Sequence, residues 1–118
     1  MARTGEALTL TAGSAHAFVG YEPFPGPSIY VYARASTNAS TSSVASTGIG
    51  ALAYWVKLVR SGSSFTGYIS SDGVNWLQLG ATQNITMAQN VYVGLALSAN
   101  EASSVVTATF DNVAITMP

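Results

Sequence analysis

The sequence predicts a single all-β domain made of antiparallel strands in two sheets, and three observations support this prediction. Residues 28–35, 54–60 and 64–70 separate their side chains onto two faces with a period of two and are rich in β-branched and aromatic residues, as strands are. An Asp-Gly dipeptide at residues 72–73 follows one of these runs and is a strong hairpin signal. No stretch of the sequence combines a 3.6-residue period with helix caps.

Residues 54–79 form the centre of the predicted fold, as three strands joined by two tight turns. Ser61-Gly62-Ser63 separates the first strand from the second. Asp72-Gly73 is expected to form a type I′ turn, because both residues tolerate the positive φ that this turn needs. The third strand is predicted at residues 75–79 and carries Trp76.

Further strands are predicted on both sides of this centre. We expect them at residues 7–11, 16–22, 28–35, 91–99 and 105–116. The Pro-rich residues 23–27 are a stiff connection, because proline lacks the backbone donor that a continuous ladder needs. Residues 1–5 are expected to be a short polar lead, and Asp111-Asn112 predicts a bulge or bend within the last strand.

Residues 36–53 have the weakest pattern in the chain. They are almost entirely Ser, Thr, Ala, Gly and Asn, and only Val44, Ile49 and Leu52 are available for burial. Long loops in compact domains are uncommon and are usually mobile or functional. The stretch is therefore interpreted as a loose connection or a poorly patterned strand, with a binding loop as the alternative.

Composition agrees with one domain that spans all 118 residues and is long enough for a two-sheet core. Hydrophobic residues make up 48% of the chain, which argues against disorder. Charged residues make up only 8%, against roughly 25% in an average domain. A surface of Ser, Thr, Ala and Gly suits a secreted or particle-associated bacterial protein, and also a chain that is partly covered by copies of itself.

Several classes of partner and cofactor are disfavoured. The net charge is −1 and the four basic residues are scattered, whereas nucleic acids and anionic membranes require clustered Lys and Arg. The absence of cysteine excludes disulfides and thiolate metal sites. No apolar run reaches the length of a membrane span, and residues 1–20 lack the apolar core of a signal peptide. If the protein is exported, we expect the signal to lie upstream of this chain.

Four segments carry a resemblance to a known family. YWVKLVRSGSSFTGYISSDGVNW, VYVGLAL and TATFDNVAI resemble the second half of a concanavalin A-like lectin/glucanase jelly-roll module, of the branch found as accessory domains in bacterial extracellular proteins. RTGEALTLTAGSAHAFVG resembles an interior piece of the same family. Family members usually carry several strands before this piece. The resemblance therefore implies an antiparallel β-sandwich of jelly-roll type that is abbreviated at its start, or whose first strands are supplied by another chain.

The sequence predicts no enzyme. The jelly-roll glucanases that share this fold place their acids in a tight strand motif such as Glu-x-Asp-x-x-Glu, and no such spacing occurs here. His16 is the only histidine, and no serine lies in a Gly-x-Ser-x-Gly elbow, so a nucleophilic triad lacks support. His16 is interpreted as a strand-edge histidine satisfied by a neighbour.

The segment SSDGVNW is similar to the Asp-box hairpin of sialidases and propellers, in which a tryptophan packs under the turn. Ser71, Asp72 and Trp76 are therefore interpreted as a fold element. No cofactor is predicted. Calcium is the alternative, because lectin-like jelly rolls often bind it, but Asp111-Asn112 and Asp72 with Asn75 would supply only two ligands at each place.

The best candidate for a binding site is aromatic. Six residues are expected on the faces of their strands that point away from the core: Tyr30, Tyr32, Arg34, Trp55, Lys57 and Tyr68. Sugars stack their C–H faces on aromatic rings while polar neighbours hold their hydroxyls, and such sites are usually preformed. Exposed aromatic residues also mark interfaces between subunits, which is the alternative interpretation of the same residues.

The predicted function is therefore a non-catalytic carbohydrate-binding or adhesion module that is extracellular or at the cell surface. Its partner would be a glycan or polysaccharide, stacked on aromatic rings of a concave sheet face. The alternative is a structural protein whose function is its own homo-oligomer, because missing strands would leave an unpaired edge and uncovered apolar surface.

Overall fold

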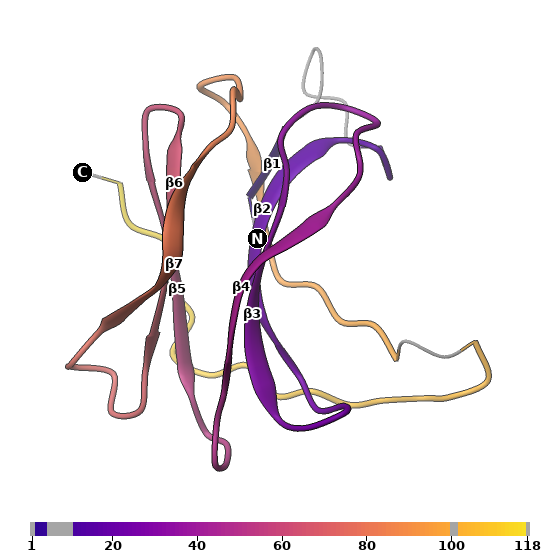
Figure 1. The fold of residues 1–118 in the computed structure, drawn as a ribbon, viewed down its shortest axis with the longest axis vertical. Helices are drawn as coiled ribbons and strands as arrows, with labels where there is room; N and C mark the ends of the chain where they lie inside the picture. Colours follow the sequence, from indigo (N-terminus) through magenta and orange to yellow (C-terminus); the bar gives the residue numbers. More distant parts are fainter. Residues whose placement is uncertain (1, 5–10, 100–101, 118) are drawn as a thin grey trace.

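The computed structural model describes residues 2–4, 11–99 and 102–117, and the described part of the chain is all-β without a helix. The strands are β1 (Ala2–Thr4), β2 (Ala15–Glu22), β3 (Ser28–Arg34), β4 (Ser42–Gly48), β5 (Trp55–Ser61), β6 (Ser64–Ser70), β7 (Leu77–Asn84) and β8 (Tyr92–Val93). They form two antiparallel sheets that face each other (Figure 1). We call the sheet β4-β3-β2-β1-β8 the wide sheet and the sheet β5-β6-β7 the narrow sheet.

The alternation predicted for residues 28–35 is confirmed in β3. Ile29, Val31 and Ala33 are buried, and the residues between them are partly exposed on the outer side of the wide sheet. β2 pairs with β3 from His16 opposite Arg34 to Glu22 opposite Ser28. The expected strand at residues 16–22 is thus present and begins one residue earlier.

The weakly patterned residues 36–53 contain a strand, β4, which forms one edge of the wide sheet. Small side chains explain how a poorly patterned stretch pairs here, since Ser46 lies opposite Tyr30 and Ser43 opposite Tyr32 and neither competes with the rings for space. The register shifts between Val31 and Tyr32, as it does at a β-bulge.

The narrow sheet contains the three strands predicted at the centre of the chain. β5 and β6 meet in a two-residue turn in which Gly62 has a φ of 60°, the conformation that a type II′ turn requires at its first central residue. The type I′ turn predicted at Asp72-Gly73 is wrong, because only Gly73 has a positive φ. The connection there is longer, and β7 starts at Leu77, so that Trp76 lies before the strand.

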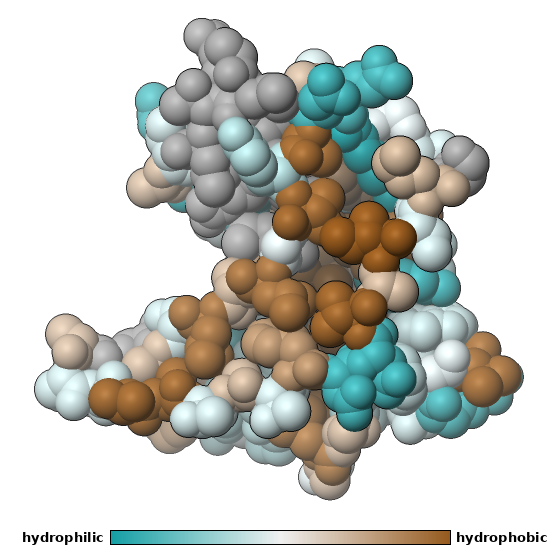
Figure 2. Space-filling model, turned by 180° about the vertical axis from the view of Figure 1, so that it is seen from behind, coloured by the Kyte–Doolittle hydropathy of each residue, from teal (hydrophilic) through white to brown (hydrophobic). Residues whose placement is uncertain are grey.

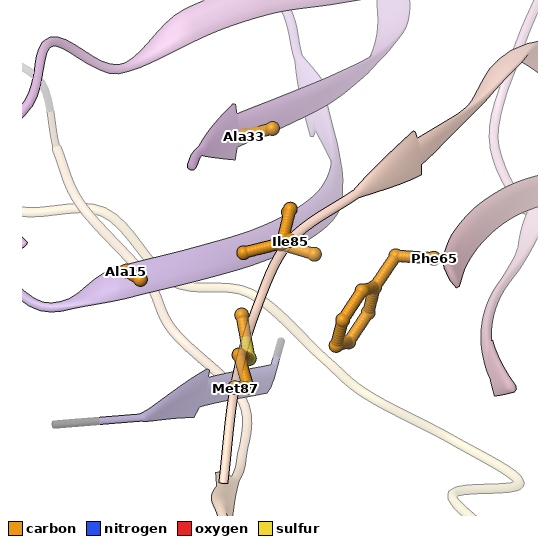
Figure 3. Packing of buried hydrophobic residues seen from close by; sticks show 6 residues of the cluster. Ala15, Ala33, Phe65, Ile85 and Met87 are labelled. Carbon is orange, nitrogen blue, oxygen red and sulfur yellow. The ribbon is translucent and has the colours of Figure 1, made fainter. Parts of the chain in front are cut away.

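Two clusters of buried apolar side chains fill the space between the sheets. One comprises Ala15, Ala17, Ala33, Phe65, Ile85 and Met87, and the other comprises Val19, Ile29, Val31, Ile49, Ile69 and Leu79. Figure 3 shows the first cluster, in which the Phe65 ring points from β6 toward Ile85 and Met87. The sheets approach closely at Gly67, where an added Cβ would lie 2.7 Å from a Val31 methyl group.

Both ends of the chain differ from the prediction. The polar lead at residues 1–5 contains β1, which joins β2 to β8. The strand expected at residues 7–11 lies almost wholly outside the described residues. The strands expected at 91–99 and 105–116 are wrong as predicted, since only Tyr92 and Val93 are in a strand and residues 102–117 are exposed without one. These sequences have strand character, but among the described residues only Tyr92 and Val93 pair with a neighbouring strand, β1.

Among the described residues, no helix is long and apolar enough to cross a membrane.

Candidate functional site

The six candidate residues divide between two surfaces that point away from each other. Tyr30, Tyr32 and Arg34 lie on the outer side of the wide sheet, because the residues between them are buried in the core. Lys57 pairs with Tyr68 on the outer side of the narrow sheet, on the opposite face from Ile69. The expectation that all six share one face is therefore wrong, because β3 and β5 belong to different sheets.

On the wide sheet, three aromatic rings form a stacked row. The ring centroids of Tyr30 and Tyr32 are 5.5 Å apart at an interplanar angle of 9°, and those of Phe18 and Tyr32 are 6.4 Å apart at 27°. Gly20 leaves room for this arrangement, since a Cβ there would collide with the Phe18 ring. The tyrosine rings therefore use their faces against each other, which leaves less ring face for a ligand.

Tyr32 is further held by Glu22. Its hydroxyl donates a 2.6 Å hydrogen bond to Glu22 Oε1. This bond to a carboxylate, assisted by burial, raises the pKa of Tyr32 to about 12, so the phenol remains protonated at physiological pH. The pair fixes the middle ring of the aromatic row, which lies between Phe18 and Tyr30.

Arg34 is engaged with the backbone. Its Nη1 donates to the carbonyl oxygens of Ala12 and Ser14, and its Nε is buried without a hydrogen-bond partner. His16, which pairs with Arg34 across the strands, is buried, and its Nδ1 lies 3.3 Å from the carbonyl oxygen of Ser14. Arg34 thus secures the turn before β2.

On the narrow sheet, one cation lies against two aromatic rings. Lys57 Nζ is 4.2 Å from the ring centroid of Trp76 and 5.0 Å from that of Tyr68. All three residues are only partly buried, so this group, which we call the Lys57 cluster, is accessible from solvent. Gln78 lies opposite Tyr68 in the register and adds an exposed amide beside it. Cation–π contacts of this kind hold the lysine and both rings in one arrangement.

Trp55 supports the turn that ends the narrow sheet. Its ring lies so close to Gly73 that an added Cβ there would come within 2.7 Å of it. The ring that packs against this turn is thus Trp55, whereas Trp76 contacts Lys57. The Asp-box interpretation assigned Trp76 only a role in the fold and so missed it as a site residue.

Asp72 organises the same turn from within. Its Oδ1 accepts hydrogen bonds from the backbone N–H groups of Val74 and Asn75, both at 2.8 Å, and from the Ser70 hydroxyl at 2.9 Å. Its Oδ2 accepts from Asn75 Nδ2 at 2.7 Å. The N–H groups of Asn75 and Val74, followed by the two side chains, hold the pKa of Asp72 well below its usual range.

These contacts make Asp72 a structural residue of the turn, as the sequence predicted for a turn-making aspartate. Its oxygens already accept four hydrogen bonds, so it has little capacity left for a cation. No group of three or more His, Cys, Asp or Glu side chains that could hold a metal ion occurs among the described residues.

The chain shows no significant match to any protein-family model, to any curated protein or to any solved structure.

Proposed function

We propose that this protein is a non-catalytic carbohydrate-binding or adhesion module, with its glycan site at the Lys57 cluster on the outer side of the narrow sheet. The observation that carries the proposal is the position of Lys57 between the rings of Tyr68 and Trp76, on an accessible sheet face. An abbreviated jelly-roll of the concanavalin A-like type is part of the same proposal, supported by the two facing antiparallel sheets.

The chemistry of the cluster suits a neutral or acidic sugar. An aromatic ring stacks on the apolar C–H face of a pyranose, and an ammonium group donates up to three hydrogen bonds to hydroxyl or carboxylate oxygens. Lys57 supplies such a donor, and the exposed Gln78 amide, whose Nε2 already donates to the Gly80 carbonyl oxygen at 2.9 Å, supplies its oxygen as an acceptor. Binding to extended polysaccharides outside the cell is the setting in which a shallow face of this kind is useful.

The wide sheet is the weaker candidate surface. Tyr30 and Tyr32 stack on each other, and Arg34 donates to backbone carbonyls, so each would have to give up a contact to bind a ligand. This is why we assign the glycan site to Lys57, Tyr68 and Trp76, with Trp55 supporting the adjacent turn, and give the tyrosines of β3 a role in stabilising the sheet.

Tryptophan fluorescence tests the proposal. A glycan array identifies ligands, and titration with a hit is expected to change the emission of Trp76. Trp76→Ala and Lys57→Gln should each weaken binding about 10-fold or more, since one stacked ring or charged hydrogen bond contributes about 1–3 kcal/mol. Tyr30→Ala, on the opposite face, is the matched control and should bind normally. An array without hits, or equal losses on both faces, would refute the assignment.

A structural assembly protein is the second candidate function, and one observation favours it. Large apolar side chains are exposed along the end of the chain, at Leu95, Leu97, Val105, Phe110, Val113, Ile115 and Met117. Soluble monomers rarely leave so much apolar surface uncovered, and such surface usually marks contact with another protein.

A further inference from the structure

The two sheets are left open on one side of the molecule. β5 pairs only with β6 and β8 only with β1, so each ends its sheet among the described strands. Val56 of β5 faces inward with Ile69, and Val93 of β8 faces inward in register with Ala2 and Ala17, yet 43% of Val56 and 50% of Val93 is exposed. Inward-facing valines are exposed only where a layer of the fold is incomplete.

The gap in the narrow sheet begins beside β5. The narrow sheet has three strands and the wide sheet five, with β5 lying opposite β2 and no strand of the narrow sheet lying opposite β8. β8 is on the distant side in Figure 1, and Figure 2 shows from that side that apolar side chains gather across the middle of the molecule. A fourth strand next to β5 would cover Val56 and would extend the narrow sheet toward Val93.

The end of the chain has the sequence of such a strand. Val106, Ala108 and Phe110 are spaced by two, and Asn112 then adopts a positive φ of 52°. A residue in this conformation is typical of a β-bulge, which inserts one residue and shifts the alternation. With that shift, Val113 and Ile115 join the same face, so residues 106–115 present one apolar face.

We propose that residues 106–115 of one copy add to the free edge of β5 in a second copy, and that two copies exchange these segments reciprocally. Charge is complementary, because the only charged residue of the segment is Asp111, whereas β5 carries Lys57 and Arg60 and no acidic residue. The added backbone pairing uses the N–H and C=O groups that an edge strand leaves open.

A second copy is the occupant because the described part of one chain covers neither the edge of β5 nor the apolar face of residues 106–115. In the structure of one chain, residues 106–115 form no strand and stay exposed, although the same chain contains the open edge of β5. Reciprocal exchange pairs the free edge of β5 and covers the apolar face of residues 106–115 in both copies. It gives a closed two-fold dimer in which the same contact occurs twice. The proposed interface gives a structural basis to the second candidate function, a structural assembly protein. The inference therefore rests on that function.

The test measures the mass of the full-length protein by sedimentation over a 100-fold range of concentration. The wild type is expected to be a dimer that dissociates on dilution. Phe110→Asp places a charge on the apolar face and should raise the dissociation constant about 30-fold or more, as for a central interface residue. Thr109→Asp is the matched control. It adds the same charge at the neighbouring residue, whose side chain points to the opposite face of the segment, and should change the dissociation constant less than about 3-fold.

A mixing experiment tests strand exchange itself. Val56→Lys blocks the acceptor with an inward-pointing charge but keeps the donor segment, whereas Phe110→Asp blocks the donor but keeps the acceptor. Each variant alone should be monomeric, and an equimolar mixture should recover a dimer held by one exchanged segment. Far-UV circular dichroism confirms that both variants keep the β-fold, so that loss of the dimer is not loss of folding.

The outcomes separate the interface from the assembly function. A wild type that stays monomeric at all concentrations overturns both. A dimer that survives Phe110→Asp unchanged, or variants that do not complement each other, overturns strand exchange and leaves assembly through another surface standing. Recovery of the dimer in the mixture supports the exchange.

Discussion

Similar side chains have opposite environments in the two halves of this protein. In the paired sheets, Phe65 and Ile29 are each only 1% exposed, whereas Phe110 and Ile115 near the end of the chain are 49% and 68% exposed. The residue types, one phenylalanine and one isoleucine, are the same in both places. They differ in whether a neighbouring strand and a facing sheet are present to cover them.

This contrast shows what a β-strand requires from the rest of a protein. A helix satisfies its hydrogen bonds within one segment, but a strand needs a paired neighbour and a facing layer. β6 has both, with β5 and β7 on its sides and the wide sheet opposite. Residues 106–117 are in no strand of either sheet among the described residues, and are exposed although their sequence favours strands.

The largest effect that would sharpen this comparison is the loss of a core ring. Phe65→Ala should lower the free energy of unfolding by about 3–5 kcal/mol, because it leaves a cavity between the sheets. Phe110→Ala should lower it by less than about 0.5 kcal/mol in the monomer, as for a surface position. Urea unfolding at low protein concentration measures both, and equal losses would show that residues 102–117 are packed in the folded monomer.

A smaller effect is expected from adding one methyl group at a glycine. Gly80 has a φ of 76° and its added Cβ would collide with Ala45 of β4, so Gly80→Ala should cost about 1–3 kcal/mol. At Gly94 an added Cβ meets no atom within 4 Å, so Gly94→Ala should change stability by less than about 1 kcal/mol. Thermal unfolding of the two variants compares them, and a Gly80→Ala variant as stable as wild type would contradict the close approach of β7 to β4.

The hydrogen bond of Tyr32 should contribute about 0.5–1.5 kcal/mol. Tyr32→Phe removes the donor to Glu22, whereas Tyr30→Phe, the control on the same face, removes a hydroxyl that makes no such bond to a described residue. Spectrophotometric titration gives a second measurement, in which Glu22→Gln should lower the raised pKa of Tyr32 toward its ordinary 10.0. An unchanged titration curve in Glu22→Gln would refute the role of the carboxylate.

The smallest effect concerns the turn at Asp72 and depends on pH. Because its folded-state pKa is lowered, the carboxylate stabilises the fold above the ordinary pKa of 3.8, and this contribution is lost as pH falls below that value. The stability of wild type relative to Asp72→Asn should therefore be constant above about pH 5 and should shrink in more acidic solution.

Asp111→Asn is the control for this experiment. It removes the same charge from the end of the chain outside the two sheets, where Asp111 Oδ1 accepts a hydrogen bond from the backbone N–H of Asn112. The melting temperature is followed from pH 2 to pH 7. A pH dependence shared by the two variants would mean that net charge, and not the turn, is responsible.

Much of the local structure could be predicted from the sequence. The alternation in residues 28–34 and 64–70 identified strands and their buried faces, because the side chains of a strand point to opposite sides whatever it pairs with. The turn at Gly62 was marked by its composition. The connection at Asp72 was located but its type was wrong, since the hydrogen bonds of that carboxylate favour a longer loop.

Only the tertiary structure decided which strands share a sheet. Alternation shows that Tyr30 and Lys57 both face away from a core, but the sheet that each strand joins depends on residues distant in the sequence, and this places the two residues on opposite sides of the protein. The same reason applies to residues 105–116, whose sequence alone predicts a strand. Whether that strand forms depends on a partner edge, and pairing between distant segments is not encoded in the local pattern of either one.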